Sequence, residues 1–176
     1  LAGFFFIHQL LKDLMMITTY DELKAAVGSW LKRDSLDTEI PNFIQLAEAH
    51  FNRVVRATEM EARATVAADG EFVALPDDFL ALREIHAEGT QDRPLKYVSP
   101  QELTRLEQSG FDGRPYAYTI ADNQIKLFPS PSADNELQIE IIYLQRIPTL
   151  STSNQTNWLL EKHPDIYLHG ALFQAE

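Results

Sequence analysis

The sequence predicts an α+β protein in which two N-terminal helices and a C-terminal helix form a helical bundle with an antiparallel β layer. Apolar residues recur at helical spacing near the start, alternate with polar residues in the middle, and return to helical spacing near the end. No strand–helix–strand unit of the kind that builds parallel sheets is present. We expect one domain over residues 16–176, with a helical part at 16–58 and 155–176 and a β part at 60–148.

The first predicted helix, over residues 20–33, begins at a capping box. Thr19 is placed to accept a hydrogen bond from the amide of Glu22, whose carboxylate can return to the cap. A second helix is predicted over residues 40–56, because Pro41 suits a first helical turn. Both segments carry apolar residues on one face and polar residues on the other, as surface helices do.

These two helices are expected to pack as an antiparallel pair that the C-terminal helix joins. Asp37 or Thr38 is expected near the N-cap of the second helix. His50 lies on the expected apolar face and is interpreted as a core histidine with a local partner, whereas Glu48 lies on the expected polar face. The residues expected to form the shared helical core are Leu23, Val27, Trp30, Phe43, Ala47, Phe51 and Val54.

The middle of the chain reads as paired strands. Asp69-Gly70 is a typical two-residue turn, so we expect residues 62–66 and 72–75 to form a hairpin across it. Residues 80–86 are expected to pair with residues 94–98 across the loop at 89–92.

A short helix and a second group of strands follow. Ser99 and Glu102 form another capping box, which predicts a helix to about Gln108. Alternating residues on both sides of Asp122-Asn123 predict a hairpin, and the alternation over 137–143 predicts a final strand.

The composition excludes several classes of function. The 176 residues contain 15 Lys and Arg against 26 Asp and Glu, a net charge of −11, which disfavours binding to the outside of nucleic acid. The chain has no cysteine, so disulfides, thiolate metal sites and cysteine nucleophiles are ruled out. The five histidines show no i, i+4 pair, and no phosphate loop or nucleophile elbow is present. We therefore predict no catalytic, cofactor-binding or metal-binding residues.

An acid/base pair at Asp77-Asp78 is the alternative to a non-enzymatic protein. The pair follows Leu75-Pro76, where aspartates are ordinary turn residues, and no second catalytic group is patterned with it. A carboxylate-based hydrolase is therefore the least favoured function.

The first 15 residues are treated as an N-terminal extension. They are apolar but too short to span a membrane, and they lack the pattern of a signal peptide. Two interpretations stay open, a translated segment upstream of a start at Met15 or Met16, and an apolar arm that docks on a neighbouring subunit. The last predicted helix has no C-cap before Glu176, so the native chain is open to continuing beyond it.

Two groups of residues are candidates for contacts with partners. A small basic cluster in this acidic chain consists of Arg53, Arg56 and Arg63, and it suits either a partner's carboxylates or surface pairing with Glu48, Glu59 and Glu61. Within it, Arg53 and Arg56 are the candidates for partner contacts. The aromatic residues Trp158, Tyr167 and Phe173 in the C-terminal helical segment suit either an interface or the core.

Three stretches, in this order and at this spacing, carry a family resemblance. They are Ile40-Pro41-Asn42-Phe43-Ile44-Gln45-Leu46-Ala47-Glu48-Ala49 with Asn52-Arg53; Leu75-Pro76-Asp77-Asp78-Phe79-Leu80 with Arg83; and Thr156-Asn157-Trp158-Leu159-Leu160, His163-Pro164-Asp165-Ile166-Tyr167-Leu168 and Gly170-Ala171-Leu172. From about Met16 to its end, the chain resembles the adaptor (head–tail connector, head-completion) proteins of tailed bacteriophages and prophages.

The resemblance implies a structural virion protein without enzymatic activity or cofactors. Its relatives form a ring, typically of twelve copies, beneath the portal protein of the capsid. The ring joins the capsid to the tail or nozzle protein and extends the channel through which DNA passes without specific binding. The implied location is the virion neck, after assembly in the host cytoplasm and without a membrane. The alternative is another phage or prophage assembly factor, such as a tail-completion protein.

Overall fold

The computed structural model describes residues 17–32, 36, 38–87, 93–131 and 137–176. The N-terminal extension, the proposed cap Asp37 and the loop at 89–92 lie outside these described residues. Within them the chain has five α-helices and seven strands, almost all of whose pairings are antiparallel, so the α+β fold class is confirmed.

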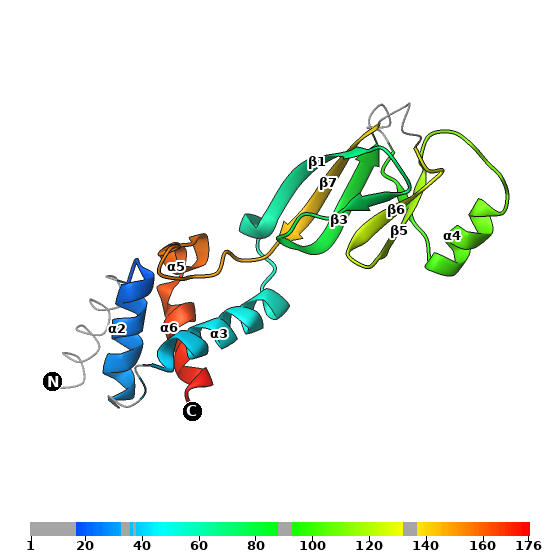
Figure 1. Ribbon diagram of the computed structural model, residues 1–176. Coiled ribbons are helices and arrows are strands. Elements are labelled where there is room, and N and C mark those ends of the chain that lie inside the picture. Colours follow the sequence, from blue (N-terminus) through cyan, green and yellow to red (C-terminus); the bar gives the residue numbers. More distant parts are fainter. Residues whose placement is uncertain (1–16, 33–35, 37, 88–92, 132–136) are drawn as a thin grey trace. The chain divides into compact units, whose positions relative to one another are not determined.

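The chain divides into two compact units. A helical unit comprises the described residues up to Arg56 together with Ile147–Glu176, and a β unit comprises Ala57–Arg146. The helices of the first unit are α2 (Tyr20–Leu31), α3 (Ile40–Val54), α5 (Trp158–Lys162) and α6 (Pro164–Gln174) (Figure 1).

The start of α2 follows the predicted capping box. The Glu22 amide donates to Thr19 Oγ1 at 3.3 Å, and the Thr19 amide donates to Glu22 Oε2 at 3.0 Å. The helix ends at Lys32, which adopts a left-handed conformation with φ of 50°. The cap of α3 differs from the prediction, because Glu39 occupies the N-cap position and its side chain makes no capping hydrogen bond.

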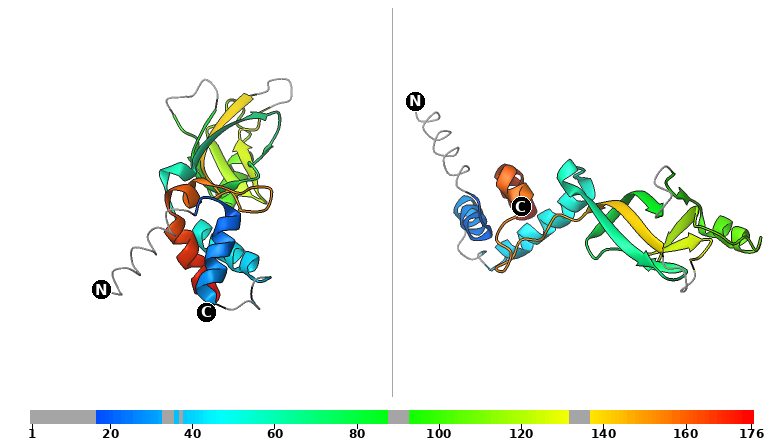
Figure 2. Two further views of the ribbon diagram at one scale, coloured as in Figure 1. Left: turned by 90° about the vertical axis from the view of Figure 1, so that its left-hand side faces the viewer. Right: turned by 90° about the horizontal axis from the view of Figure 1, so that it is seen from above.

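Helix α6 organises the helical unit, because both α2 and α3 pack mainly against it (Figures 1 and 2). The expected direct pairing of α2 with α3 is therefore largely replaced by contacts through α6.

The small residue Gly170 of α6 permits the close crossing of α6 with α3. A Cβ atom at Gly170 would lie 2.5 Å from Phe51 Cζ and 3.3 Å from Ala47 Cβ, so a larger side chain would force the two helices apart.

The predicted core of the helical unit is partly wrong. Leu23, Val27, Ala47 and Phe51 are buried as expected. The side chains predicted to be buried but found exposed or half-exposed are Trp30 (41% exposed), Val54 (58% exposed), Phe43 and His50.

The buried face of α3 is rotated relative to the expected one. Ile40, Ile44 and Glu48 are buried there together with Ala47 and Phe51. Apolar residues lie on more than one side of α3, and the crossing with α6 at Gly170 selects the side that carries Ile44. The sequence pattern alone left that choice open.

The β unit contains two sheets instead of the single predicted layer. The first has the order β1-β7-β3 and the second the order β2-β6-β5-β4, with a helix, α4, beside the second sheet. Their bounds are β1 (Glu61–Ala68), β2 (Phe72–Ala74), β3 (Phe79–Ala87), β4 (Lys96–Tyr97), α4 (Pro100–Glu107), β5 (Ala117–Ala121), β6 (Gln124–Phe128) and β7 (Leu137–Gln145).

The hairpin predicted across Asp69-Gly70 is wrong. Strand β1 pairs along its whole length with β7, and β2 pairs with β6, so the two strands beside Asp69-Gly70 belong to different sheets. The hairpin across Asp122-Asn123 is confirmed. It joins β5 to β6, and both turn residues have positive φ values, 49° and 60°, as the tightest hairpin turns require.

The expected pairing of residues 80–86 with 94–98 is also largely wrong. Strand β4 pairs in parallel with β5 over two residues, which is an exception to the predicted antiparallel arrangement. One backbone hydrogen bond, from the Leu95 amide to the Ile85 carbonyl at 2.8 Å, connects this segment to β3.

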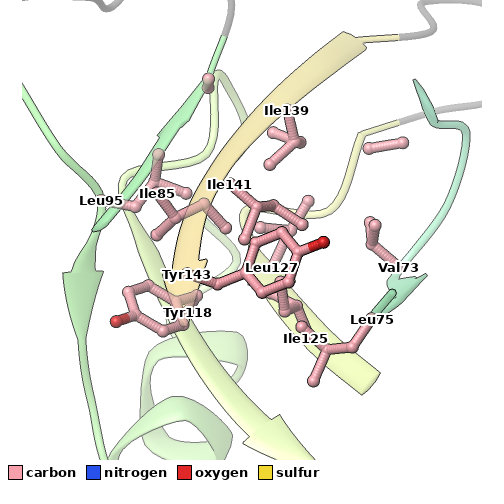
Figure 3. Close-up of a cluster of buried hydrophobic side chains, with 12 residues drawn as sticks. Val73, Leu75, Ile85, Leu95, Tyr118, Ile125, Leu127, Ile139, Ile141 and Tyr143 are labelled. Carbon is pink, nitrogen blue, oxygen red and sulfur yellow. The ribbon is translucent and has the colours of Figure 1, made fainter. Parts of the chain in front are cut away.

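The two sheets bury a common hydrophobic core. Ile139 and Ile141 extend from β7 into this core and are fully buried (Figure 3). They meet residues of the second sheet and of the loops beside it. The other buried members of the cluster are Ala68, Val73, Leu75, Ile85, Ala87, Leu95, Tyr118, Ile125, Leu127 and Tyr143.

Candidate interaction surfaces

A buried polar network fixes the positions of the helices in the helical unit. Glu48 is only 3% exposed, and its Oε1 accepts hydrogen bonds from the Leu150 amide at 2.8 Å and the Tyr167 hydroxyl at 3.1 Å. Asn157 donates to that hydroxyl at 2.7 Å and to the Pro148 carbonyl at 2.7 Å. The network connects three parts of the unit: helix α3, helix α6 and the segment that precedes α5. These hydrogen bonds hold the three parts in one arrangement.

A second amide side chain of α3 extends this connection. The Asn52 Oδ1 accepts from the Ile147 amide at 2.9 Å, and its Nδ2 donates to the Glu48 carbonyl at 3.1 Å. The assignment of Glu48 to a polar face, made from the sequence, is therefore wrong. Its apolar neighbours Ile44 and Phe51, at i−4 and i+3, are the signal that could have indicated burial.

The hydrogen bonds to the Glu48 carboxyl offset only part of the free-energy cost of burying it. Its Oε2 has no hydrogen-bond partner among the described residues. Burial raises the pKa of Glu48 above its ordinary 4.5, although the hydrogen bonds from Leu150 and Tyr167 oppose this change. Burial likewise raises the pKa of the Tyr167 hydroxyl, and the nearby Glu48 carboxyl adds to the effect.

Replacing Glu48 with Gln should remove a pH-dependent contribution to stability. Because the pKa of Glu48 is raised in the folded state, its contribution is fully present below about pH 4.5 and is lost as the pH rises above that value. The free energy of unfolding of Glu48→Gln, relative to the wild type, should therefore increase between pH 4.5 and pH 7. Urea unfolding followed by tryptophan fluorescence measures this, since both tryptophans, Trp30 and Trp158, lie in the helical unit.

The matched control is Glu161→Gln, which changes an exposed carboxylate of the same unit. Its stability relative to the wild type should not follow the Glu48→Gln trend. If the two variants gave the same pH profile, the raised pKa of Glu48 would be contradicted.

The two candidate arginines lie on an exposed part of α3 and just after it. Arg53 and Arg56 are both exposed. Arg56 Nη1 donates to the carbonyls of Val55 at 2.6 Å and Asn52 at 3.2 Å, and its side chain folds back over the end of the helix. The two cations are accessible to a partner.

Apolar residues accompany these arginines on α3. Leu46 is 52% exposed and Val54 58% exposed, and His50 lies between them at a spacing of four residues from each. We call Leu46, His50, Arg53 and Val54 the α3 stripe. An exposed apolar row of this kind on a rigid helix is typical of contact surfaces.

A second apolar surface involves α2 and α6. The rings of Trp30 and His169 meet edge to face, with centroids 6.1 Å apart. His169 lies three residues after Ile166 (37% exposed) and four before Phe173 (71% exposed), which places all three on one side of α6. We call Trp30, Ile166, His169 and Phe173 the α2–α6 patch.

The three aromatic candidates from the sequence have different environments. Phe173 is exposed and belongs to the α2–α6 patch. Tyr167 is fully buried, where its ring packs edge to face on Phe51 at 5.3 Å, so it belongs to the core of the helical unit. Trp158 is half-buried, and its indole nitrogen is buried without a hydrogen-bond partner among the described residues. Trp30 and Ile166 were not among the candidates.

Asp78, one of the two aspartates considered as an acid/base pair, makes structural contacts within the β unit. Asp78 Oδ1 accepts from the Tyr143 hydroxyl at 2.9 Å, and its carbonyl accepts from the Arg146 amide at 2.7 Å. Burial, with Asp78 as a further cause, raises the pKa of Tyr143 to about 12. These contacts tie the turn to β7 and provide a structural reason for an aspartate at this position.

The described part of the chain offers neither a metal-binding cluster nor a membrane-spanning helix. No group of three or more His, Asp or Glu side chains there is arranged to hold a metal ion. None of the described helices is long and apolar enough to cross a membrane.

An open hollow of about 450 Å³ in the β unit is lined by Asp112, Gly113, Arg114, Pro115, Ser130, Pro131 and Leu137.

The described part of this α+β protein exposes large apolar side chains, a feature typical of the class of proteins that bind other proteins. The comparison with family models identifies the family within that class. The model of the SU10 adaptor protein family matches residues 18–176, so the chain belongs to this family of phage adaptor proteins. No individually curated protein matches the chain.

Proposed function

We propose that this protein forms a ring beneath the portal of a tailed phage, where it joins the capsid to the tail and extends the DNA channel. The match to the adaptor family over residues 18–176 is the observation that carries the proposal. The exposed α3 stripe and α2–α6 patch support it, since a ring subunit needs two different contact faces. The partners would be further copies of the chain, the portal protein and a tail or nozzle protein, and the location would be the virion neck after assembly in the host cytoplasm.

The acidity of the chain fits a conduit for DNA. Each subunit carries a net charge of −11. A ring of such subunits would repel the phosphate backbone, so DNA would slide through the channel without specific binding.

The same charge leads us to propose that the ring needs a template. Like-charged subunits repel one another, and the portal would raise their local concentration and align their contact faces. We therefore expect weak self-association of the pure protein in analytical ultracentrifugation. A stable ring formed by pure protein at low salt would contradict this part of the proposal.

Reversing the charge of the two exposed arginines tests the proposed role. The variant Arg53→Glu with Arg56→Glu should keep its circular dichroism spectrum, because both side chains are exposed. It should yield filled heads without tails, since the basic group would no longer meet carboxylates of a neighbouring protein. Electron microscopy of lysates counts heads and complete virions.

The control is Arg93→Glu with Arg105→Glu, which makes the same charge change at exposed positions of the β unit. The control should assemble more virions than the Arg53 and Arg56 variant. Normal virions from the Arg53 and Arg56 variant would contradict a role for these arginines in assembly. If both variants failed equally, the net charge of the subunit, and not this face of α3, would explain the loss of virions.

A tail-completion protein is the second candidate, and the match to an adaptor family does not favour it. The two functions differ in position. Labelling of the protein in virions would place a connector next to the portal and a tail-completion protein farther along the tail. We propose that the β unit faces the next ring or the tail.

A further inference from the structure

The helical unit exposes two apolar surfaces. The α3 stripe contains Leu46 and Val54, each more than half exposed. The α2–α6 patch contains Phe173, the most exposed large apolar side chain described (71%), beside Trp30. Exposure of apolar side chains to water is unfavourable, so the α3 stripe and the α2–α6 patch are suited to contact with another protein.

The charged residues beside the two surfaces have opposite signs. Arg53 is part of the α3 stripe, and Arg56 follows it by three residues. On α6, Asp165 precedes His169 by four residues, so its side chain lies on the same side of the helix as the patch. Glu176 lies just beyond the end of α6, three residues after Phe173 in the chain. All four charged side chains are exposed.

We propose that the α2–α6 patch of one copy packs on the α3 stripe of the next copy in the ring. Apolar side chains fill the centre of the contact, with Arg53 and Arg56 of one copy near Asp165 and Glu176 of the other. Pairing either surface with itself would bring like charges together, which favours the head-to-tail contact over a symmetric dimer. This inference rests on the proposed ring and assigns its subunit interface.

Cysteine cross-linking tests the contact directly, because the chain has no cysteine of its own. The double variant Val54→Cys with Phe173→Cys places one thiol on each surface at exposed positions. In purified virions a short bifunctional thiol reagent should link successive copies into a ladder of multimers on denaturing gels. Each single-cysteine variant should give no species beyond a dimer, because it carries one thiol per copy.

A charge exchange tests the same contact without cross-linking. Arg53→Asp and Asp165→Arg, made singly, should each lower the number of tailed virions several-fold, because each places like charges at the interface. The double variant restores opposite charges and should recover virion yield. Circular dichroism of each purified variant separates this effect from misfolding.

The outcomes distinguish this interface from the ring itself. A neck ring seen by electron microscopy, with neither a multimer ladder nor rescue by the double exchange, would overturn the interface and leave the proposed function standing. Cross-links from these thiols to the portal in place of neighbouring copies would also overturn it. Virions that lack the protein in the neck would refute the proposed function.

Discussion

Replacing Phe51 with Ala should lower the free energy of unfolding of the helical unit by about 3–5 kcal/mol. The ring is 5% exposed, packs edge to face on Tyr167 and lies where a Cβ on Gly170 would collide. Its removal leaves a cavity at the crossing of α3 and α6. This crossing is the main contact between helices in the unit. Urea unfolding followed by tryptophan fluorescence reports on this unit, which contains both tryptophans.

Trp30→Ala is the matched control for a large aromatic side chain in the same unit. Trp30 is 41% exposed, so its loss should cost less than about half as much as the loss of Phe51. Unfolding of this variant is followed by the fluorescence of Trp158. Equal losses in the two variants would show that Trp30 is part of the core, as the sequence pattern suggested, and would weaken its place in the α2–α6 patch.

Replacing Asn157 with Ala should lower the free energy of unfolding by about 2–4 kcal/mol. Its Oδ1 caps α5 by accepting a hydrogen bond from the Leu160 amide at 2.8 Å. Its Nδ2 donates to the Pro148 carbonyl and to the Tyr167 hydroxyl. Alanine would leave three buried or partly buried polar groups without this partner. Urea unfolding measured by circular dichroism gives the loss.

Two further variants separate the parts of this effect. Asn154→Ala removes a more exposed amide that donates to the Thr149 carbonyl at 2.8 Å, and it should cost less than about 1 kcal/mol. Asn157→Ser restores a capping oxygen alone and should recover about 1 kcal/mol relative to Asn157→Ala. If Asn157→Ala and Asn154→Ala were equally stable, the buried network would not be important for the unit.

The sequence by itself determined the elements whose signals are local. The capping box of Thr19 and Glu22 set the start of α2, and Asp122-Asn123 set the hairpin of β5 and β6. In each case, the residues that specify the structure are within a few positions of one another. The family, too, was identifiable from the order of three stretches.

Only the tertiary structure decided which elements are partners. The turn at Asp69-Gly70 has hairpin chemistry, yet β1 pairs with β7, some 70 residues further along the chain. A two-residue turn fixes the direction of the chain, but the partner of a strand depends on which pairing buries more apolar surface. Here that pairing places Ile139 and Ile141 in the core between the two sheets.

The candidate surfaces depended on the tertiary structure for the same reason. Helix α3 carries apolar residues on more than one side, and the close approach of Gly170 to Phe51 decided which of them are buried. That choice left Leu46, His50 and Val54 exposed beside Arg53. It also buried Glu48, whose partners Leu150 and Tyr167 lie more than 100 residues away in the chain. Helical periodicity shows that a helix has an apolar face, but the neighbouring elements determine which face is buried.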